Sequence, residues 1–510
     1  MTVESFDIKK IAIIGGGVAG IAALNELLHT SKDGISTFDN DDSNPAFEEI
    51  VLFERNDTLG GNWYYSNKSD PVFPSQDILN DGNYNKPETL DPPLKSIPNP
   101  NDLKLTSLDS PIIKKHDETV RWSNSAAYPA LFSNIIAPLV RLPNGLKHYD
   151  SNGSRSINPF STAGEIHKDL YKVVQENQLN KFIRFQTTVE KVEKSKGKWN
   201  LVLRKTDGIK DYWYQETFDA IITANGHYSV PFIPFIENLN QYNQSHPNTL
   251  LHTKGIKNFD QFQNQNVLII GSHSSSVDVI KFLVGSSKSI TVSRRTVKNT
   301  SGAGIEVIFE QPDLIIKPKI KEFDGSNVIF VDDSIGVYDK IIFATGYHFH
   351  YPFLKNQNLI QLGQIVDENS KFSLIKNLYL YAFSVDDPTF TTIGIQQSPY
   401  LFATIESQAA AIAGVWSNFS KLPSKEFQLE WLNQRNVAGD FHIYNVDTAR
   451  ENLADLCIKL APKNRKHPFD ILNVSKEEVQ NGWEHVVRIY NLFKSGKLTY
   501  DKVIDLNNSK

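Results

Sequence analysis

The chain has 510 residues, 40% hydrophobic and 22% charged, so it has enough apolar side chains for a sizeable core. Its 53 basic and 58 acidic residues give a net charge of -5, which argues against a general nucleic-acid binder. Cys457 is the only cysteine, which excludes an internal disulfide, a redox-active thiol pair and a cysteine-based metal site, and we expect no metal. With no signal peptide and no long apolar segment, we expect a soluble cytoplasmic protein, without excluding peripheral membrane association.

A β-branched run at residues 11–14 ends in a glycine cluster and is followed by an apolar helical pattern. The cluster has the G-x-G-x-x-G spacing of a dinucleotide-binding turn. Its glycines permit, in order, the tight turn, the close approach of a pyrophosphate and the packing of helix on sheet. The helix amino terminus then faces the phosphates. We therefore expect a cofactor to lie against Gly15, Gly17, Val18, Ala19 and Gly20.

A second strand, at residues 50–53, ends in Glu54. This acid lies much further from the glycines than the usual spacing of roughly 20 positions. The polar insertion at residues 31–46 accounts for the excess, because surface loops tolerate insertion. We expect Glu54 to accept hydrogen bonds from ribose hydroxyls. Gly61, Asn62 and Trp63 follow, and adjacent glycines before an indole indicate backbone contact with a flat cofactor.

Residues 66–111 are rich in Asn, Asp, Pro and Ser and show little periodicity, which is typical of a lid or excursion. After this excursion, the pattern predicts a helix at residues 162–176 and strands at residues 182–186, 199–203 and 220–224.

A second strand–turn–helix unit begins at residue 266, and its turn opens with Gly271. His273 and Ser276 stand where glycine is usual. We expect the His273 side chain to crowd a pyrophosphate, and Ser276 to remain small enough for close helix packing. Ser274 and Ser275 are predicted to cap the helix and donate to phosphate. Asp278 is assigned to the same nucleotide site.

The next strand, at residues 289–293, is followed by Arg294 and Arg295 instead of an acid. Guanidinium groups there can pair with a 2′-phosphate, so NADPH is favoured over NADH. The alternative interpretation is that these arginines form surface ion pairs.

Taken in order, these motifs resemble those of the flavin-containing monooxygenases. The resemblance also rests on four further segments: residues 128–134, ending in Ser133 and Asn134; residues 225–231; residues 344–347; and residues 406–409, which include Gln408. The Asn-Gly-His-Tyr segment and the Asn-rich loops look like fungal, thiol-specific members of this family.

The resemblance implies an α/β fold with two Rossmann-like dinucleotide-binding domains of the three-layer ββα type. Residues 1–225 and 336–510, with the C-terminal helices, would form the FAD-binding domain, and residues 226–335 an inserted NADPH-binding domain. NADPH would reduce FAD, O₂ would add at flavin C4a, and the resulting hydroperoxide would oxygenate a small-molecule thiol, sulfide or amine. Asn134 matches the family's asparagine beside the flavin, and its amide can both donate and accept hydrogen bonds.

The chain departs from the family's identifying motif, F-x-G-x-x-x-H-x-x-x-[FY]. The motif falls on His246, Asn248, His252 and Ile256, and retains only the histidine. We expect His252 to be structural and His227 to pack at the domain hinge.

Two alternative functions stay open: a Baeyer–Villiger or N-hydroxylating flavin monooxygenase, and a flavin-binding protein with a degenerate NADPH site. A flavin disulfide reductase is rejected for want of a cysteine pair. The sequence leaves open the substrate, the role of the excursion and whether the chain forms a homodimer.

Overall fold

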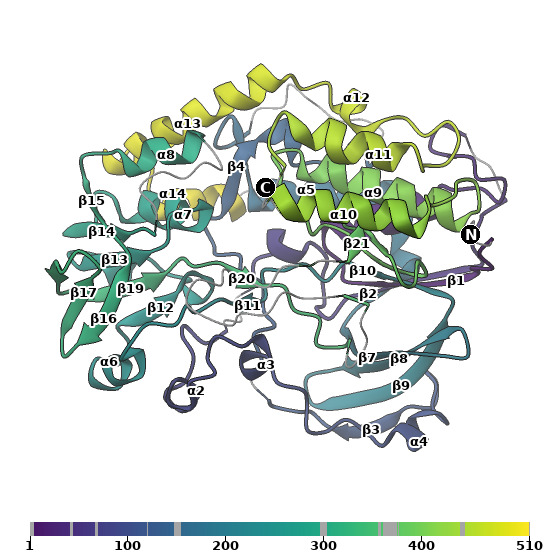
Figure 1. Ribbon diagram of the computed structural model, residues 1–510, viewed down its shortest axis with the longest axis horizontal. Helices are drawn as coiled ribbons and strands as arrows, with labels where there is room; N and C mark the ends of the chain where they lie inside the picture. The colour runs from purple at the N-terminus through teal and green to yellow at the C-terminus, as the bar shows by residue number, and fades with distance from the viewer. Residues whose placement is uncertain are drawn as a thin grey trace.

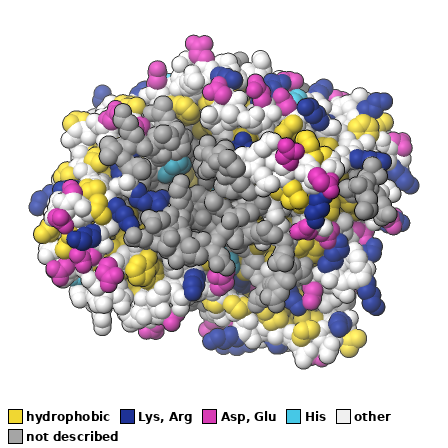
Figure 2. Space-filling view, viewed as in Figure 1, with side chains coloured by type: hydrophobic (Ala, Val, Ile, Leu, Met, Phe, Trp, Pro, Cys, Tyr) yellow, Lys and Arg dark blue, Asp and Glu magenta, His cyan; other side chains and the backbone are white. Residues whose placement is uncertain are grey.

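A computed structural model describes residues 5–40, 44–66, 70–119, 121–146, 155–295, 303–354, 359–360, 375, 377–438 and 444–508. Two sheets, the first mixed and the second parallel throughout, lie side by side and are each covered by helices on at least one face, so the predicted α/β fold with two Rossmann-like domains is confirmed (Figure 1). Acidic and basic side chains are intermixed over the face shown in Figure 2, in keeping with the small net charge. No helix in the described ranges is long and apolar enough to cross a membrane.

The first sheet has the strand order β21-β22-β23-β10-β1-β2-β6. Its strands are β1 (Lys10–Ile14), β2 (Glu49–Phe53), β6 (Ile183–Arg184), β10 (Ala220–Thr223), β21 (Leu378–Tyr379), β22 (Phe383–Ser384) and β23 (Phe390–Thr392). The apolar run of β1 is buried between β2 and β10, both parallel to it. Helices α1 (Val18–Leu28) and α9 (Leu401–Trp416) pack together in the core on one face.

A four-stranded antiparallel sheet covers the other face of the first sheet and completes the three layers. Its strands, in spatial order, are β3 (Ile112–Lys115), β9 (Lys210–Phe218), β8 (Lys198–Thr206) and β7 (Thr187–Ser195). Alternate residues of β8, such as Trp199 and Leu201, are buried against Phe53 and Ile221 of the first sheet.

The second sheet has the strand order β12-β19-β13-β14-β15, and all its pairings are parallel. Its strands are β12 (Leu250–His252), β13 (Asn266–Ile270), β14 (Ser289–Ser293), β15 (Leu314–Lys317) and β19 (Lys340–Phe343). Helices α7 (Ser274–Leu283) and α8 (Ala303–Phe309) belong to this domain, as does an antiparallel sheet of β16 (Ile320–Asp324), β17 (Asn327–Phe330) and β18 (Ile335–Gly336).

The predicted domain boundary at residue 335 is wrong, because β19 lies inside the second sheet, with Ile341 opposite Leu268. The sequence of a short apolar strand does not show which sheet the strand will join. The C-terminal helices α13 (Lys476–Lys494) and α14 (Tyr500–Asn508) also pack on the second domain: Ile489 and Phe493 share an apolar cluster with Ile280.

The excursion bridges the two domains with the short helices α2 (Gln76–Asp81), α3 (Pro87–Leu90) and α4 (Pro100–Leu103). Leu79 packs in the apolar cluster of Leu239, in the second domain, whereas Leu103 packs beside Trp213 of the antiparallel sheet.

The remaining helices and strands are α5 (Ala163–Glu176), α6 (Leu239–Ser245), α10 (Lys425–Ala438), α11 (Asp455–Ile458), α12 (Pro468–Leu472), β4 (Phe132–Ile136), β5 (Phe160–Thr162), β11 (Val230–Pro231) and β20 (Tyr347–His348). Short 3₁₀ turns are η1 (Gly61–Trp63), η2 (Ala137–Leu139), η3 (Leu179–Phe182), η4 (Thr253–Gly255) and η5 (Asp260–Phe262), and η6 (Arg450–Ala454) is a π-helical turn.

Candidate active site

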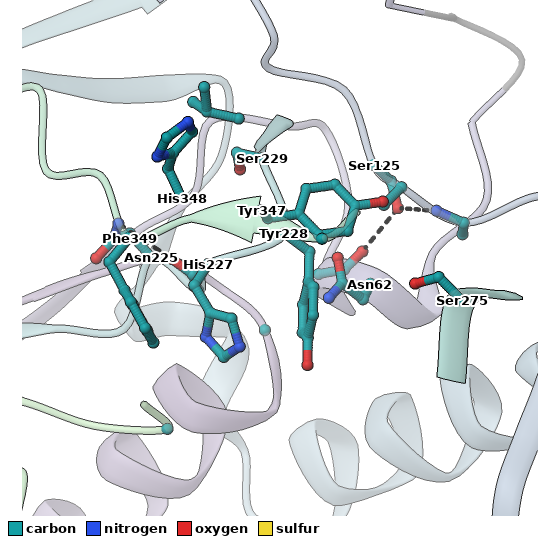
Figure 3. Close-up of a pocket in the computed structure, with 18 of the residues that line it drawn as sticks. Asn62, Ser125, Asn225, His227, Tyr228, Ser229, Ser275, Tyr347, His348 and Phe349 are labelled. Atoms are coloured by element: carbon teal, nitrogen blue, oxygen red, sulfur yellow. Dashed lines mark hydrogen bonds between the residues drawn. The ribbon is translucent and has the colours of Figure 1, made fainter. Parts of the chain in front are cut away.

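One large cavity, of about 2170 Å³, is lined by residues of both domains. The first glycine turn, after β1, and the second turn, after β13, both face it. Asn62 and Ser275, from these two halves of the molecule, lie in the same part of the cavity in Figure 3. The cavity therefore joins the two predicted nucleotide sites.

The glycines of the first turn have separate roles. Gly15 has a φ of +110°, and a Cβ there would lie 2.5 Å from the carbonyl oxygen of Ala224. A Cβ on Gly20 would lie 1.9 Å from the carbonyl oxygen of Gly15, so Gly20 lets α1 pack against the turn and does not line the cavity. A Cβ on Gly17 would meet only the backbone of Gly61, at 3.6 Å. Gly17 is therefore the position that leaves space for a ligand.

Glu54, at the end of β2, is buried and fixed to this turn. Its Oε2 accepts a hydrogen bond from the Gly16 backbone at 2.6 Å, and its Oε1 accepts one from the Asn56 backbone at 2.8 Å. Burial raises the pKa of Glu54, while the two backbone donors oppose that rise. The carboxylate lines the cavity beside the glycines, as the predicted ribose acceptor should.

The segment after Glu54 closes the same side of the cavity. Gly60 donates a hydrogen bond from its backbone to the Gly16 carbonyl at 3.0 Å, and its φ is +119°. Asn62 and Trp63 line the cavity, and the Trp63 ring lies 6.4 Å from that of Phe402. Bare backbone and an indole thus face the space, as a flat cofactor ring requires.

Strand β4 brings Ser133 and Asn134 to the cavity in different ways. The Ser133 hydroxyl donates to the Ile135 carbonyl at 2.7 Å and accepts from the Ser161 backbone at 3.0 Å, so it ties β4 to β5. The next side chain, Asn134, is exposed and lines the cavity. Its amide forms no hydrogen bond with another residue in the described ranges, and is available to a ligand.

The second turn repeats the first with one change in chemistry. Gly271 has a φ of +115°, and a Cβ there would lie 2.4 Å from the Ala344 carbonyl oxygen. Ser276, at the position of the third glycine, is buried and donates its hydroxyl to the Gly271 carbonyl at 2.7 Å. The predicted contact of Ser276 with the cofactor is therefore not seen, because its side chain is used inside the turn and does not line the cavity.

The rest of the second turn is open to the cavity. Gly271, His273, Ser274, Ser275 and Asp278 all line it. His273 directly precedes α7, with an exposed side chain, and Ser274 Oγ lies 3.4 Å from its Nδ1. In α1 the equivalent position is Gly17. The imidazole thus stands where a pyrophosphate would approach.

Replacing His273 with glycine should lower the KM for NADPH. Relief of steric crowding is worth about 1 kcal/mol or more, or about fivefold in affinity. The measurement is the initial rate of NADPH oxidation, with His246→Gly as a control in the same domain, outside the cavity. An unchanged or higher KM in His273→Gly would show that the imidazole does not crowd the coenzyme.

The two arginines after β14 are not equivalent. Arg294 is buried, and its Nη1 and Nη2 each donate to the Glu306 carboxylate at 2.8 Å. It does not line the cavity, so its predicted pairing with a 2′-phosphate is not supported by the structure. Arg295 is exposed and lines the cavity together with Lys319. Sequence reasoning missed Lys319, because only the parallel pairing of β14 with β15 brings the segments after these two strands to the same edge of the sheet.

Gln408, on α9, also lies behind the cavity wall. Its Nε2 donates to the Leu380 carbonyl at 2.9 Å, and its Oε1 accepts from the Gly394 backbone at 3.3 Å. Gly394 lines the cavity, whereas Gln408 does not. The predicted cofactor contact is therefore replaced by a supporting role.

A buried ion pair between Lys254 and the excursion was not predicted. Lys254 Nζ lies 2.9 Å from Asp70, in the excursion, and also donates to the Ser229 carbonyl. Burial lowers the pKa of Lys254 to about 8, although Asp70 opposes the shift. Its neighbour His252 bonds the Gly346 carbonyl through Nε2 and accepts the Lys254 backbone N–H at Nδ1, which is a structural role.

His227 lies in the cavity wall. Its ring packs against Tyr228 and Phe349, with centroids 4.2 and 4.8 Å away (Figure 3). Burial lowers its pKa to about 4, so the imidazole is neutral near pH 7.

Comparison with known proteins also points to a flavoprotein with two dinucleotide-binding domains. Residues 307–456 match the family described as flavin-binding monooxygenase-like, and residues 156–381 match the pyridine nucleotide-disulphide oxidoreductases. Flavin-containing monooxygenase FMO GS-OX-like 9 of Arabidopsis thaliana is 27% identical, over 84% of this chain and 81% of its own length. Trimethylamine monooxygenase of Methylocella silvestris is 25% identical, over 82% and 76%.

Among solved structures, S-allyl-L-cysteine S-oxygenase from Allium sativum aligns with a TM-score of 0.64 at 21% identity, and covers 97% of this chain and all of that one. An open structure of cyclohexanone monooxygenase aligns with a TM-score of 0.51 at 14% identity, over 89% and 97%. These likenesses show the fold.

The two glycine turns on one cavity define a flavoprotein with two dinucleotide-binding domains, and its cofactors are FAD and NADPH. Within this class, the chain is similar to the flavin-binding monooxygenases, whose family model matches residues 307–456. The match to disulphide oxidoreductases reflects the shared domains, because Cys457 is the only cysteine of the chain.

Proposed function

We propose that the protein is an NADPH-dependent flavin monooxygenase that transfers one oxygen atom of O₂ to a sulfur or nitrogen atom of a small molecule. The observation that carries this proposal is that two glycine turns, one per domain, face the same cavity. Such an arrangement lets one cofactor reduce the other without leaving the protein.

The residues of the first domain fit FAD. The turn at Gly15 and Gly17 would hold the pyrophosphate, and Glu54 the ribose. Asn62 and Trp63 would flank the ring system. Bound FAD and NADPH supply the redox chemistry, so the chain itself has to bind, orient and shield them from water.

The residues of the second domain fit NADPH. The backbone of the Gly271 turn and the hydroxyls of Ser274 and Ser275 would bind the pyrophosphate at the start of α7. Arg295 and Lys319 would bind the 2′-phosphate.

Asn134 is the proposed catalytic residue, since its amide faces the cavity and can donate a hydrogen bond without giving up a proton. Asn134→Ser should leave flavin reduction by NADPH unchanged but divert more turnover to H₂O₂. One lost hydrogen bond of about 1.4 kcal/mol corresponds to about tenfold. Stopped-flow absorbance and an H₂O₂ assay measure the two effects, with Asn200→Ser in β8 as the control. Unaltered H₂O₂ yield would remove Asn134 from this role.

For the substrate, we propose a thiol or a sulfide first and a tertiary amine second. The named relatives include an S-oxygenase and a trimethylamine monooxygenase, which supports both atoms as acceptors. The test is a screen of NADPH consumption over small thiols, thioethers, tertiary amines and cyclic ketones, with H₂O₂ and the oxygenated product measured in parallel. Oxygenation of ketones alone would indicate Baeyer–Villiger chemistry. NADPH oxidation that yields H₂O₂ and no oxygenated product would indicate an oxidase.

We also propose a cytoplasmic location, because a chain with a single cysteine suits a reducing compartment.

A further inference from the structure

The arginines of the cavity fall into two groups. Arg121 and Arg204 are held in ion pairs with carboxylates that include Glu190. Arg55, Arg295 and Arg435 also line the cavity but form no ion pair with a carboxylate in the described ranges. A guanidinium without a carboxylate partner, in a cavity built for ligands, is available to bind an anion.

Two of these three cations belong to the cofactor sites. Arg55 directly follows Glu54, at the end of β2, and Arg295 comes two positions after β14. Each therefore lies at the ribose end of one dinucleotide site. Arg435 belongs to neither of the two strand–turn–helix units that form these sites, because it lies on α10, in the C-terminal region.

Arg435 stacks on a buried tyrosine ring. Its guanidinium lies over the ring of Tyr444, 4.5 Å from the centroid, and its Nε is buried without a hydrogen-bond partner among the described residues. Tyr444 is itself buried, and its backbone donates a hydrogen bond to the Gln397 carbonyl at 2.9 Å. Gln397 lines the cavity three positions after Gly394, where a Cβ would lie 3.1 Å from Ala19 of the first turn. The stacked arginine thus lies on a residue that contacts the segment bordering the first turn, on the FAD side of the cavity.

The cavity that Arg435 lines suits an anion on an apolar stem. Asp447 also lines the cavity, but its carboxylate pairs with Lys476 at 3.0 Å, so no carboxylate of the described residues pairs with the Arg435 guanidinium. Trp63, Leu401 and Phe402 line the cavity and offer apolar surface.

We propose that Arg435, supported by Tyr444, is the subsite for an anionic group of the substrate, and that the preferred substrates are thiols or thioethers that carry a carboxylate. This inference rests on the proposed function. The same guanidinium could meet the diphosphate of FAD, since both ligands present anionic oxygens, and the experiment separates the two.

The experiment compares holoenzyme variants with two matched thioethers, methylthiopropanoate and the neutral methylthiopropanol. Wild type should have the lower KM for the carboxylate. In Arg435→Met that KM should rise about tenfold or more, while the KM for the alcohol changes less than twofold. Arg435→Lys, which keeps the charge but loses the fork geometry, should fall in between. Lys425→Met is the control. Lys425 lies on the same helix, pairs with Asp386 and does not line the cavity.

A second readout does not need turnover. Pentanoate and pentanol are titrated into the oxidised holoenzyme, and binding is followed by the flavin absorption spectrum. Wild type should bind pentanoate more tightly, and Arg435→Met should lose this preference. Equal binding of the two ligands by wild type, or a preference that survives in Arg435→Met, would overturn the subsite. Loss of bound FAD in Arg435→Met, with equal effects on both thioethers, would also overturn it and assign the arginine to the cofactor. If NADPH fails to reduce the flavin, the proposed function fails, whereas the pentanoate titration still decides the subsite.

Discussion

Gly17→Val should produce a folded protein that does not retain FAD. A Cβ at this position would meet only the Gly61 backbone, at 3.6 Å, and the φ of -80° suits any residue, so the fold accepts the substitution. The two added methyl groups enter the space that a pyrophosphate needs. Overpacking costs up to about 3 kcal/mol, so FAD affinity should fall about hundredfold.

The measurement is the FAD content after desalting, together with the melting temperature of the apoprotein. His273→Val is the matched control, because residue 273 has the position in α7 that Gly17 has in α1. It should keep FAD and alter only the response to NADPH. Gly20→Ala should instead destabilise the fold, because its Cβ would lie 1.9 Å from the Gly15 carbonyl oxygen. Wild-type FAD affinity in Gly17→Val would mean that the cofactor does not use this turn.

Arg295→Ala should reduce the preference for NADPH over NADH at least tenfold, whereas Arg294→Ala should leave it unchanged. Arg295 lines the cavity, and a charge-assisted hydrogen bond to phosphate is worth roughly 1.5–3 kcal/mol. Arg294 has both Nη atoms on Glu306, so its loss removes two charge-assisted hydrogen bonds at a buried site. Its substitution should lower the melting temperature by several degrees.

The ratio of kcat/KM for the two coenzymes, measured on purified holoenzyme, decides between these arginines. Lys319→Ala should also lower the preference, since Lys319 lines the cavity with Arg295. Loss of preference in Arg294→Ala alone would contradict the assignment and would require the ion pair with Glu306 to open when the coenzyme binds.

The sequence was a good guide wherever a motif is local. Gly15 and Gly271 form the turns predicted after β1 and β13, because a strand, a turn and a helix within a few residues determine the backbone path. The order of these units was enough to predict both domains.

Sequence reasoning failed where a partner comes from a distant segment. Nothing near Arg294 shows that Glu306 will bind both its Nη atoms, and nothing near Gln408 shows that its amide will hold Gly394 and Leu380. The strand at Lys340–Phe343 was assigned to the wrong domain for the same reason, since pairing with β13 is a tertiary property. No sequence pattern marked Arg435 as a candidate site residue, because it belongs to no recognisable motif.

The central claim is that the cavity brings two dinucleotide cofactors together. Its most direct test is to mix the purified yellow holoenzyme with NADPH in the absence of oxygen and to follow the visible flavin absorption. The account predicts that the flavin band is lost as NADPH is oxidised, and that it returns when air is admitted. A flavin band that stays unchanged under excess NADPH would contradict it.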